Sequence, residues 1–207
     1  RLIVTSTSEI YGKNTSDSLS EEDDRILGSP LKSRWAYSEA KAIDEILAYT
    51  YWREKGLETV IVRLFNTVGP RQTGSYGMVV PRFVGQALRT QPLTIFGDGT
   101  QTRCFCHVSD VVKGLVALSE HPEAFGKVFT LGGTEEISIS DLAELIIRLV
   151  GSDSEREYLA YDAAYEEGLE DMARRVPNTN RARQLVGFET SICLEDIIRS
   201  AIEDQTS

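Results

Sequence analysis

Histidine and cysteine are scarce in this sequence, and their scarcity bears on the kinds of site it can hold. The 207 residues include two histidines and three cysteines. They form no cluster at the spacing of metal ligands, so we predict no metal site. An odd, sparse set of cysteines is typical of reduced thiols, which favours a cytoplasmic location over a disulfide framework.

Basic residues and long apolar runs are also few. Lysine and arginine total 22 against 32 acidic residues, for a net charge of -10. Such a chain repels nucleic acid and anionic membranes, so neither is an expected partner. No apolar run reaches the about 20 residues of a transmembrane helix, and no signal peptide is visible. The first residue is Arg1, directly before an apolar run, so we expect sequence to be missing before it.

The first 70 residues alternate between strand and helix patterns. Leu2–Thr5 and Thr59–Phe65 are apolar and β-branched, which predicts buried strands. Between them, Ser33–Lys55 carries apolar residues at helical spacing and ends near Gly56. Strand, helix and strand in this order predict a parallel βαβ unit.

The rest of the chain predicts shorter elements. Helices are expected over 79–88, 109–121, 140–151, 180–185 and 194–202, with Ser109 capping the second and Ser140 opening the third. Strands are expected over 93–96, 103–108, 127–131 and 157–161, the third returning to the main sheet. The segment 165–176 is charged and carries no clear pattern.

The predicted fold class is α/β, the C-terminal part of a Rossmann-type parallel sheet with a smaller α+β substrate-binding region. Residues 1–71 would form the C-terminal half of a dinucleotide-binding domain, with 103–133 packing back onto it. Residues 72–102 and 134–207 would form the substrate-binding region.

Tyr37 and Lys41 are the first candidate catalytic pair. Four residues apart on a helix, their side chains lie one turn apart on one face. A nearby ammonium favours the phenolate and would lower the tyrosine pKa from about 10. Such a tyrosine can take a proton from a sugar hydroxyl near neutral pH. The hydroxyl-rich Thr5–Glu9 follows the first strand, where ligands bind in open α/β sheets; a turn that caps backbone groups is the alternative.

Four segments together resemble the extended short-chain dehydrogenase/reductase family. They are TSTSEIYG from residue 5, Tyr37-x-x-x-Lys41, RLFNTVGPR from residue 63 and GDGTQTR from residue 97, in the family's order and at about its spacing. The family includes NAD-dependent nucleotide-sugar epimerases, dehydratases and UDP-glucuronate decarboxylases. One departure is large: its Gly-x-x-Gly-x-x-Gly cofactor loop is absent from these residues. We therefore expect this chain alone to be poorly active or inactive.

The resemblance implies roles for individual residues. Catalysis would rest on Thr7, Glu9, Tyr37, Lys41 and Arg175. NAD would contact Thr5, Tyr37, Lys41 and Leu64. The substrate, a UDP-sugar, would contact Ser8, Asn66, Arg71, Phe96, Arg103 and Arg175, the arginines because a guanidinium suits phosphate or carboxylate oxygens. The resemblance also implies a homodimer through the Tyr37/Lys41 helix, with Tyr49, Trp52 and the helix alanines on the shared face.

Residues 7–9 bear on the choice of reaction. The family's dehydratases carry an Asp-Glu pair after the threonine, whereas here Ser8 stands in place of that Asp, which counts against dehydration. Thr-Ser-Glu resembles the decarboxylases, as does the Arg175-Val176-Pro177 segment, although Val176, Asn178 and the acidic run 165–171 depart from them.

We therefore expect a UDP-glucuronate decarboxylase, with UDP-glucose 4-epimerase as the alternative. A non-catalytic module would have lost Tyr37, Lys41 or the hydroxyls of residues 5–9, and all are present. An inactive fragment of such an enzyme stays open as an alternative, because the cofactor loop is absent from these residues. A reductase of small carbonyls would not need Asn66 and Arg103 at diphosphate positions. The choice between NAD and NADP is not readable from these residues, and NAD is the expectation.

Overall fold

The main sheet is parallel and has three strands. The computed structural model describes residues 1–75, 78–160 and 172–207. Strands β1 (Leu2–Thr7), β2 (Thr59–Leu64) and β7 (Lys127–Leu131) lie in the order β1-β2-β7. Thr7 pairs with Leu64, and Leu64 pairs with Leu131, so the three carboxyl ends share one edge. The predicted return of 127–131 to the main sheet is confirmed.

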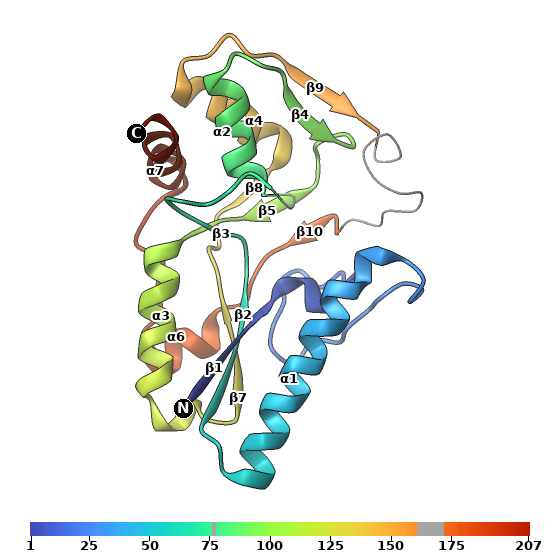
Figure 1. Cartoon of the computed structure of the whole chain (residues 1–207), viewed down its shortest axis with the longest axis vertical. Coiled ribbons are helices and arrows are strands. Elements are labelled where there is room, and N and C mark those ends of the chain that lie inside the picture. The colour runs from blue at the N-terminus through green and yellow to red at the C-terminus, as the bar shows by residue number, and fades with distance from the viewer. Residues whose placement is uncertain (76–77, 161–171) are drawn as a thin grey trace.

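Helices cover both faces of this sheet (Figure 1). Helix α1 (Ala36–Lys55) packs on β1 and β2 from one side. Helix α3 (Val108–Glu120) and the short α6 (Asn180–Val186) lie on the other side, α6 against β7. Gly56 ends α1 in a left-handed conformation (φ 67°), and its N–H bonds the carbonyls of Trp52 and Tyr51. Glycine is the residue that closes a helix in this way at least cost.

A second region is built from short strands and three helices. The helices are α2 (Val79–Leu88), α4 (Ile139–Val150) and α7 (Leu194–Thr206). The strands form a sheet of β10 (Arg174–Arg175), β5 (Thr102–Cys104) and β8 (Glu136–Ser138), a pair of β4 (Leu93–Phe96) and β9 (Arg156–Leu159), and a pair of β3 (Thr67–Val68) and β6 (Cys106–His107).

The core of this second region lies where α2, α4 and α7 meet. Phe83, Leu142 and Ile198 are fully buried there. Burial of each such side chain stabilises the fold by roughly 1.5–3 kcal/mol. The three helices are held by apolar contacts, while β5 and β10 lie between this core and the main sheet (Figure 1). The substrate-binding candidates Phe96 and Arg103 lie on β4 and β5 of this region.

Several details differ from the sequence prediction. The cap of α3 is His107, whose Nδ1 accepts from the N–H of Ser109, and not Ser109 itself. The cap of α4 is Ser138, whose Oγ accepts from the N–H of Asp141, and not Ser140. In both cases a helix begins directly after a strand, so the cap is the last strand residue. Residues 103–108 form two strands in different sheets and not one extended run.

Two predictions bear on regions rather than single elements. The division of the chain into a dinucleotide-binding part and a substrate-binding part stays a prediction. Helix α6 falls within the residues predicted to form the substrate-binding part, yet it packs on α3 and β7. Gly77, Tyr161 and the acidic run 165–171 lie outside the described residues.

Candidate functional site

The site begins where β1 ends. Thr7 is buried, and its Oγ1 accepts a hydrogen bond from the N–H of Glu9 at 3.2 Å, which caps the 3₁₀ helix η1 (Ser8–Tyr11). Gly12 turns the chain at φ 59°, where a Cβ would lie 2.3 Å from the Ile26 carbonyl oxygen. Only glycine fits there. The tight turn presents Ser8 and Glu9 directly beyond the carboxyl end of the strand.

Glu9 lies between two arginines that are distant in sequence. Its Oε1 is 2.6 Å from Nη1 of Arg175, and its Oε2 is 2.5 Å from Nη1 of Arg34. Arg175 comes from β10 and Arg34 from the 3₁₀ helix η2 (Ser33–Trp35) that leads into α1. Arg175 also donates to Oγ of Ser8 at 3.4 Å. The structure therefore brings together three of the predicted residues, Ser8, Glu9 and Arg175.

The Glu9 carboxyl is held in its charged form. Burial by itself raises the pKa of Glu9, but Arg175 and then Arg34 outweigh that cost, and the pKa lies below its usual value of 4.5. An opposite charge in contact favours the ionised form in this way. Glu9 is thus an anion near neutral pH. No motif indicates Arg34; the one feature of the sequence that points to it is its position three residues before Tyr37.

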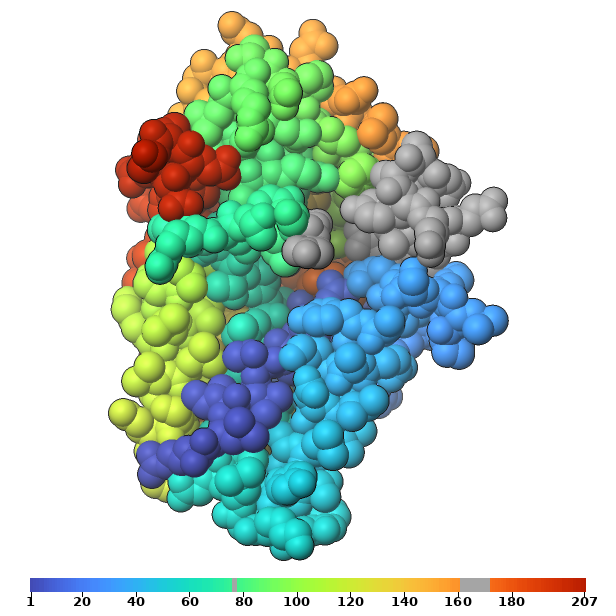
Figure 2. Space-filling view, in the orientation of Figure 1, coloured from blue at the N-terminus to red at the C-terminus, as the bar shows by residue number. Residues whose placement is uncertain are grey.

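Tyr37 and Lys41 lie near the start of α1, where Tyr37 is 53% exposed and the side chain of Lys41 is 25% exposed. The ammonium of Lys41 donates to Oδ2 of Asp44 at 3.1 Å, one turn further along the helix. Figure 2 shows α1 in light blue, forming much of the lower surface beside the dark blue N-terminal residues. The pair shares a helix as predicted, and Lys41 is directed to Asp44.

These groups suit the ribose end of a dinucleotide. Thr5 is exposed on β1, and Leu64 ends β2 at the shared carboxyl edge. A phenol, an ammonium and a hydroxyl are donors and acceptors of the kind that ribose hydroxyls pair with. Contact of NAD with Thr5, Tyr37, Lys41 and Leu64, at the edge where ligands bind in open α/β sheets, stays a prediction.

Asn66 and Arg103 join the two regions. The side-chain amide of Asn66 donates to the carbonyl of Cys104 at 3.0 Å, which ties the end of β2 to β5. Arg103 is buried, and its Nη1 donates to the carbonyls of Thr102 and Met172. Both side chains therefore have a supporting role in the architecture, beside any contact with a substrate.

Phe96 and Arg71 lie apart from the Glu9 cluster. The guanidinium of Arg82, on α2, stacks 4.7 Å from the ring centroid of Phe96 at the end of β4. Such a cation–π contact orients the ring. Arg71 is exposed, with φ 66°, and its backbone N–H donates to Asp204 of α7 at 2.7 Å. The described contacts of Arg71 are thus with α7.

A buried polar network supports the sheet beneath α1. Arg63 on β2 makes a two-pronged contact with Glu45 of α1, at 2.9 and 2.8 Å, and donates to the Tyr11 hydroxyl at 3.2 Å. Burial works against the charge of Arg63, yet Glu45 and Tyr11 raise its pKa. Burial is the largest effect on Tyr11 and raises its pKa. This network fixes α1 and η1 relative to each other, and neither motif nor periodicity indicated it.

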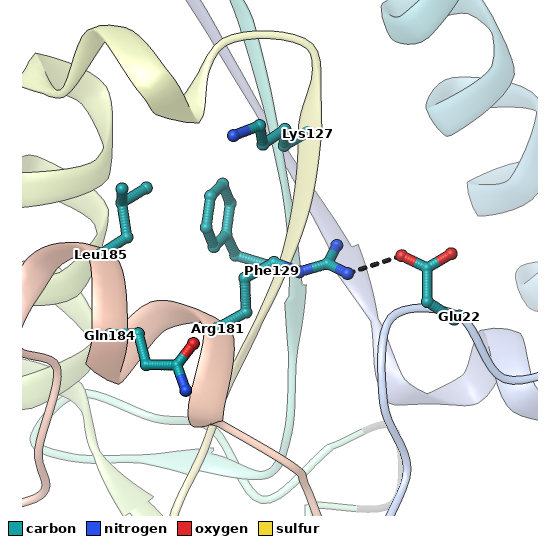
Figure 3. Close-up of a pocket in the computed structure, with 6 residues that line it drawn as sticks. All are labelled: Glu22, Lys127, Phe129, Arg181, Gln184 and Leu185. Atoms are coloured by element: carbon teal, nitrogen blue, oxygen red, sulfur yellow. Dashed lines mark hydrogen bonds and ion pairs between the residues drawn. The ribbon is translucent and has the colours of Figure 1, made fainter.

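A hollow of about 510 Å³ lies elsewhere, against the outer edge of β7 (Figure 3). Its lining comprises Glu22, Lys127, Phe129, Arg181, Gln184 and Leu185, none of which is a predicted site residue. Arg181 donates to the Val128 carbonyl at 3.1 Å, and Glu21 accepts from the Thr130 N–H at 2.8 Å. These two bonds occupy outward-facing groups of β7, and a covered edge does not template pairing with another chain.

Within 1–75, 78–160 and 172–207, no group of three or more His, Cys, Asp or Glu side chains could hold a metal ion. In the same residues, no helix combines the length and apolar character needed to cross a bilayer.

Comparison with known proteins gives a consistent result. A UDP-N-acetyl-alpha-D-glucosaminuronate decarboxylase of Bacillus cytotoxicus is 36% identical over 204 residues, which is 98% of this chain and 63% of that protein. UDP-glucuronic acid decarboxylase 1 of Xenopus tropicalis is 39% identical over 202 residues, 98% of this chain and 46% of that protein. The chain thus spans about half to two thirds of the length of these relatives.

Solved structures extend the comparison to the fold. The UDP-glucuronic acid 4-epimerase of Bacillus cereus, in complex with UDP-glucuronic acid and NAD, superposes with a TM-score of 0.86 at 30% identity, over 99% of this chain and 60% of that one. The model of the NAD dependent epimerase/dehydratase family matches residues 1–132. A parallel sheet with a Tyr-x-x-x-Lys helix on one face accords with that match, and the chain belongs to the NAD dependent epimerase/dehydratase family.

Proposed function

We propose that this chain is the catalytic and substrate-binding part of an NAD-dependent decarboxylase of a UDP-uronic acid, with UDP-glucuronate as the expected substrate. The observation that carries the proposal is the pairing of Glu9 with Arg175 directly beyond Thr7. A guanidinium beside the catalytic hydroxyl can bind a carboxylate on the sugar. The named activities of the similar decarboxylases support the same choice.

The reaction starts at the C4 hydroxyl of the sugar. Tyr37 takes the O4 proton, with Thr7 as the neighbouring hydroxyl and Lys41 as the neighbouring cation. Bound NAD+, held by Thr5, Tyr37, Lys41 and Leu64, would supply the hydride acceptor for C4 and afterwards the hydride donor. The resulting ketone is β to the C6 carboxylate, so the C5–C6 bond can break with its electron pair drawn toward the ketone oxygen. Carbon dioxide leaves, and a proton from solvent is added at C5. The C4 ketone then regains a hydride at carbon, and its oxygen regains the proton held by Tyr37.

Arg175 and Glu9 act near C5 and C6 in this proposal. Arg175 holds the C6 carboxylate before the bond breaks. Glu9 is ionised, so in this state it cannot supply the proton at C5. Its part is to orient Arg175 and Ser8. Asn66 and Arg103 would contact the diphosphate, Phe96 the base, and Arg71 an outer phosphate oxygen.

UDP-sugar 4-epimerisation is the second candidate. It starts with the same ketone, which rotates and takes hydride back on the other face. The similarity to the Bacillus cereus UDP-glucuronic acid 4-epimerase favours it. That neighbour also binds a uronate, so the arginine beside Glu9 does not separate the two reactions by itself.

Product identification separates these candidates. The full-length protein is incubated with NAD+ and, separately, UDP-glucuronate and UDP-glucose, and products are identified by NMR. UDP-xylose with carbon dioxide is the expected result. UDP-galacturonate from the first or UDP-galactose from the second, without carbon dioxide, would make the protein a 4-epimerase. If neither UDP-glucuronate nor UDP-glucose is turned over, the substrate assignment is wrong, and an inactive module is the better interpretation.

We also propose a homodimer through α1. Ile43, Ile46 and Leu47 are 56%, 63% and 51% exposed on this helix. Of the helix alanines, Ala42 and Ala48 are buried, whereas Ala36 and Ala40 are exposed. Sedimentation velocity of wild type and Ile46→Glu tests it: the variant should sediment as a monomer. A cytoplasmic location, checked by cell fractionation, completes the proposal.

A further inference from the structure

Arg34 is a charged side chain with a place in the candidate site that no motif assigns. Its guanidinium contacts one carboxylate oxygen of Glu9, while Arg175 contacts the other. The three side chains are largely enclosed, at 19% exposed for Arg34, 17% for Glu9 and 7% for Arg175. In so enclosed a position, a carboxylate that loses its partner is costly.

The two arginines are held by different parts of the molecule. Arg34 lies on η2, stacked 5.5 Å from the ring centroid of the buried Trp35, and three residues before Tyr37. Arg175 lies on β10, which pairs with β5 of the second region. Arg34 therefore belongs to the same rigid segment as the catalytic tyrosine, and Arg175 belongs to the region expected to bind the sugar.

This division matters when a substrate arrives. A carboxylate on the sugar that binds Arg175 competes with Glu9 for the same guanidinium. With Arg175 as its sole partner, Glu9 would then be an unpaired charge, or would take up a proton and lose its charge. Arg34 already occupies the second oxygen of Glu9, so the carboxylate keeps a partner.

We infer that Arg34 is a positioning residue, which keeps Glu9 ionised and in place while Arg175 transfers from Glu9 to the substrate carboxylate. The inference rests on the proposed function, in that it takes the substrate to be a uronate. The charged groups described against Glu9 are Arg34 from η2 and Arg175 from β10, and Ser8 is the neutral group beside them. Loss of Arg34 leaves Glu9 with one cation.

The first test is the pH profile of kcat/KM for UDP-glucuronate, measured on the full-length protein with NAD+. Arg34→Ala should lower kcat/KM by about 10- to 100-fold and move the acid limb to higher pH, since Glu9 then takes up a proton more readily. Arg34→Lys should restore part of both changes. Arg53→Ala is the matched control, an exposed arginine of α1 that pairs with Glu54, and should leave the profile unchanged.

Two outcomes would overturn the inference. An acid limb that stays in place in Arg34→Ala would make Arg34 a structural ion pair only. The same holds if Arg34→Ala lowers the turnover of UDP-glucuronate and of a neutral UDP-sugar alike, because a role in handing Arg175 to a carboxylate concerns the uronate alone.

A second measurement stands apart from turnover, so it remains decisive if the proposed function itself fails. The melting temperatures of wild type and Arg34→Ala are compared from pH 7 to pH 4. Glu9 has a lowered pKa when folded, so its ion pairs stabilise the fold near neutral pH and that contribution is lost as the pH falls. The deficit of Arg34→Ala should therefore be largest near neutral pH and shrink as the pH falls below about 4.5. A deficit that is equal at every pH would refute control of Glu9 by Arg34.

Discussion

Glu9 and Tyr37 both follow strand β1 in the candidate site, yet their surroundings differ. Glu9 is enclosed, with both carboxylate oxygens on arginines from η2 and β10. Tyr37 is half exposed, and the ammonium of Lys41 is paired with Asp44. The carboxylate is a charge taken out of water, so the chain itself must supply its partners. The phenol remains in contact with solvent and open to a ligand. One part of the site is complete within the chain, and the other is ready for a cofactor or substrate.

The largest effect is expected when the hydroxyl of Tyr37 is removed. Tyr37→Phe should lower kcat of the full-length protein by about 10³-fold, within the range for a positioned general base, with its melting temperature unchanged because Tyr37 is half exposed. Tyr51→Phe is the matched control, on the same helix and equally exposed at 53%. If both variants kept wild-type kcat, Tyr37 would not be the base.

A substitution of Glu9, which is enclosed between Arg34 and Arg175, should lower the stability of the protein as well as its rate. Glu9→Gln removes the charge between two arginines and should lower the free energy of unfolding by about 2–3 kcal/mol, somewhat below the ~3–5 kcal/mol of fully buried pairs. Urea unfolding at pH 7 measures it. Glu39→Gln, whose carboxylate pairs with Arg25 at 3.3 Å and is 55% exposed, serves as the control, with about 0–1 kcal/mol expected. Equal losses in both variants would contradict the enclosed character of Glu9.

Acid should affect the same part of the site. The folded pKa of Glu9 lies below its usual value of 4.5, so its stabilising contribution is complete above that value and is lost as the pH falls through the folded pKa. Glu9→Gln should therefore flatten the pH dependence of the melting temperature below about pH 4.5. An unchanged slope would mean that other carboxylates account for the acid sensitivity.

The smallest effect is expected at Asp44. Asp44→Asn frees Lys41 from an ion pair whose carboxylate is 48% exposed, and such pairs contribute about 0–1 kcal/mol. The free energy of unfolding should fall by no more than about 1 kcal/mol, and kcat should stay within about twofold of wild type. The KM for NAD+ measures any change in the position of Lys41. A tenfold rise in that KM would show that Asp44 orients Lys41, and the exposed part would then also be organised by the chain.

Local patterns were enough for much of the fold. The helix from Ala36 to Lys55, the strand from Thr59 and the return of Lys127–Leu131 follow from apolar spacing, β-branched runs and terminal glycines. The helix caps were harder to predict from the sequence, because His107 and Ser138 are strand residues that also cap the helices that follow. Two-residue strands such as β10 carry no periodicity at all.

By itself, the sequence determined the family, from four short segments in a fixed order. It also determined the parallel βαβ unit and the placing of Tyr37 and Lys41 on one helix, since these depend on local patterns in neighbouring stretches of the chain. Only the tertiary structure decided that Arg175 and Arg34 share Glu9, that Arg63 spans Glu45 and Tyr11, and that α6 packs on β7. The physical reason is that an ion pair between distant segments depends on how whole elements pack. A buried charge is then stable only where that packing supplies its partner.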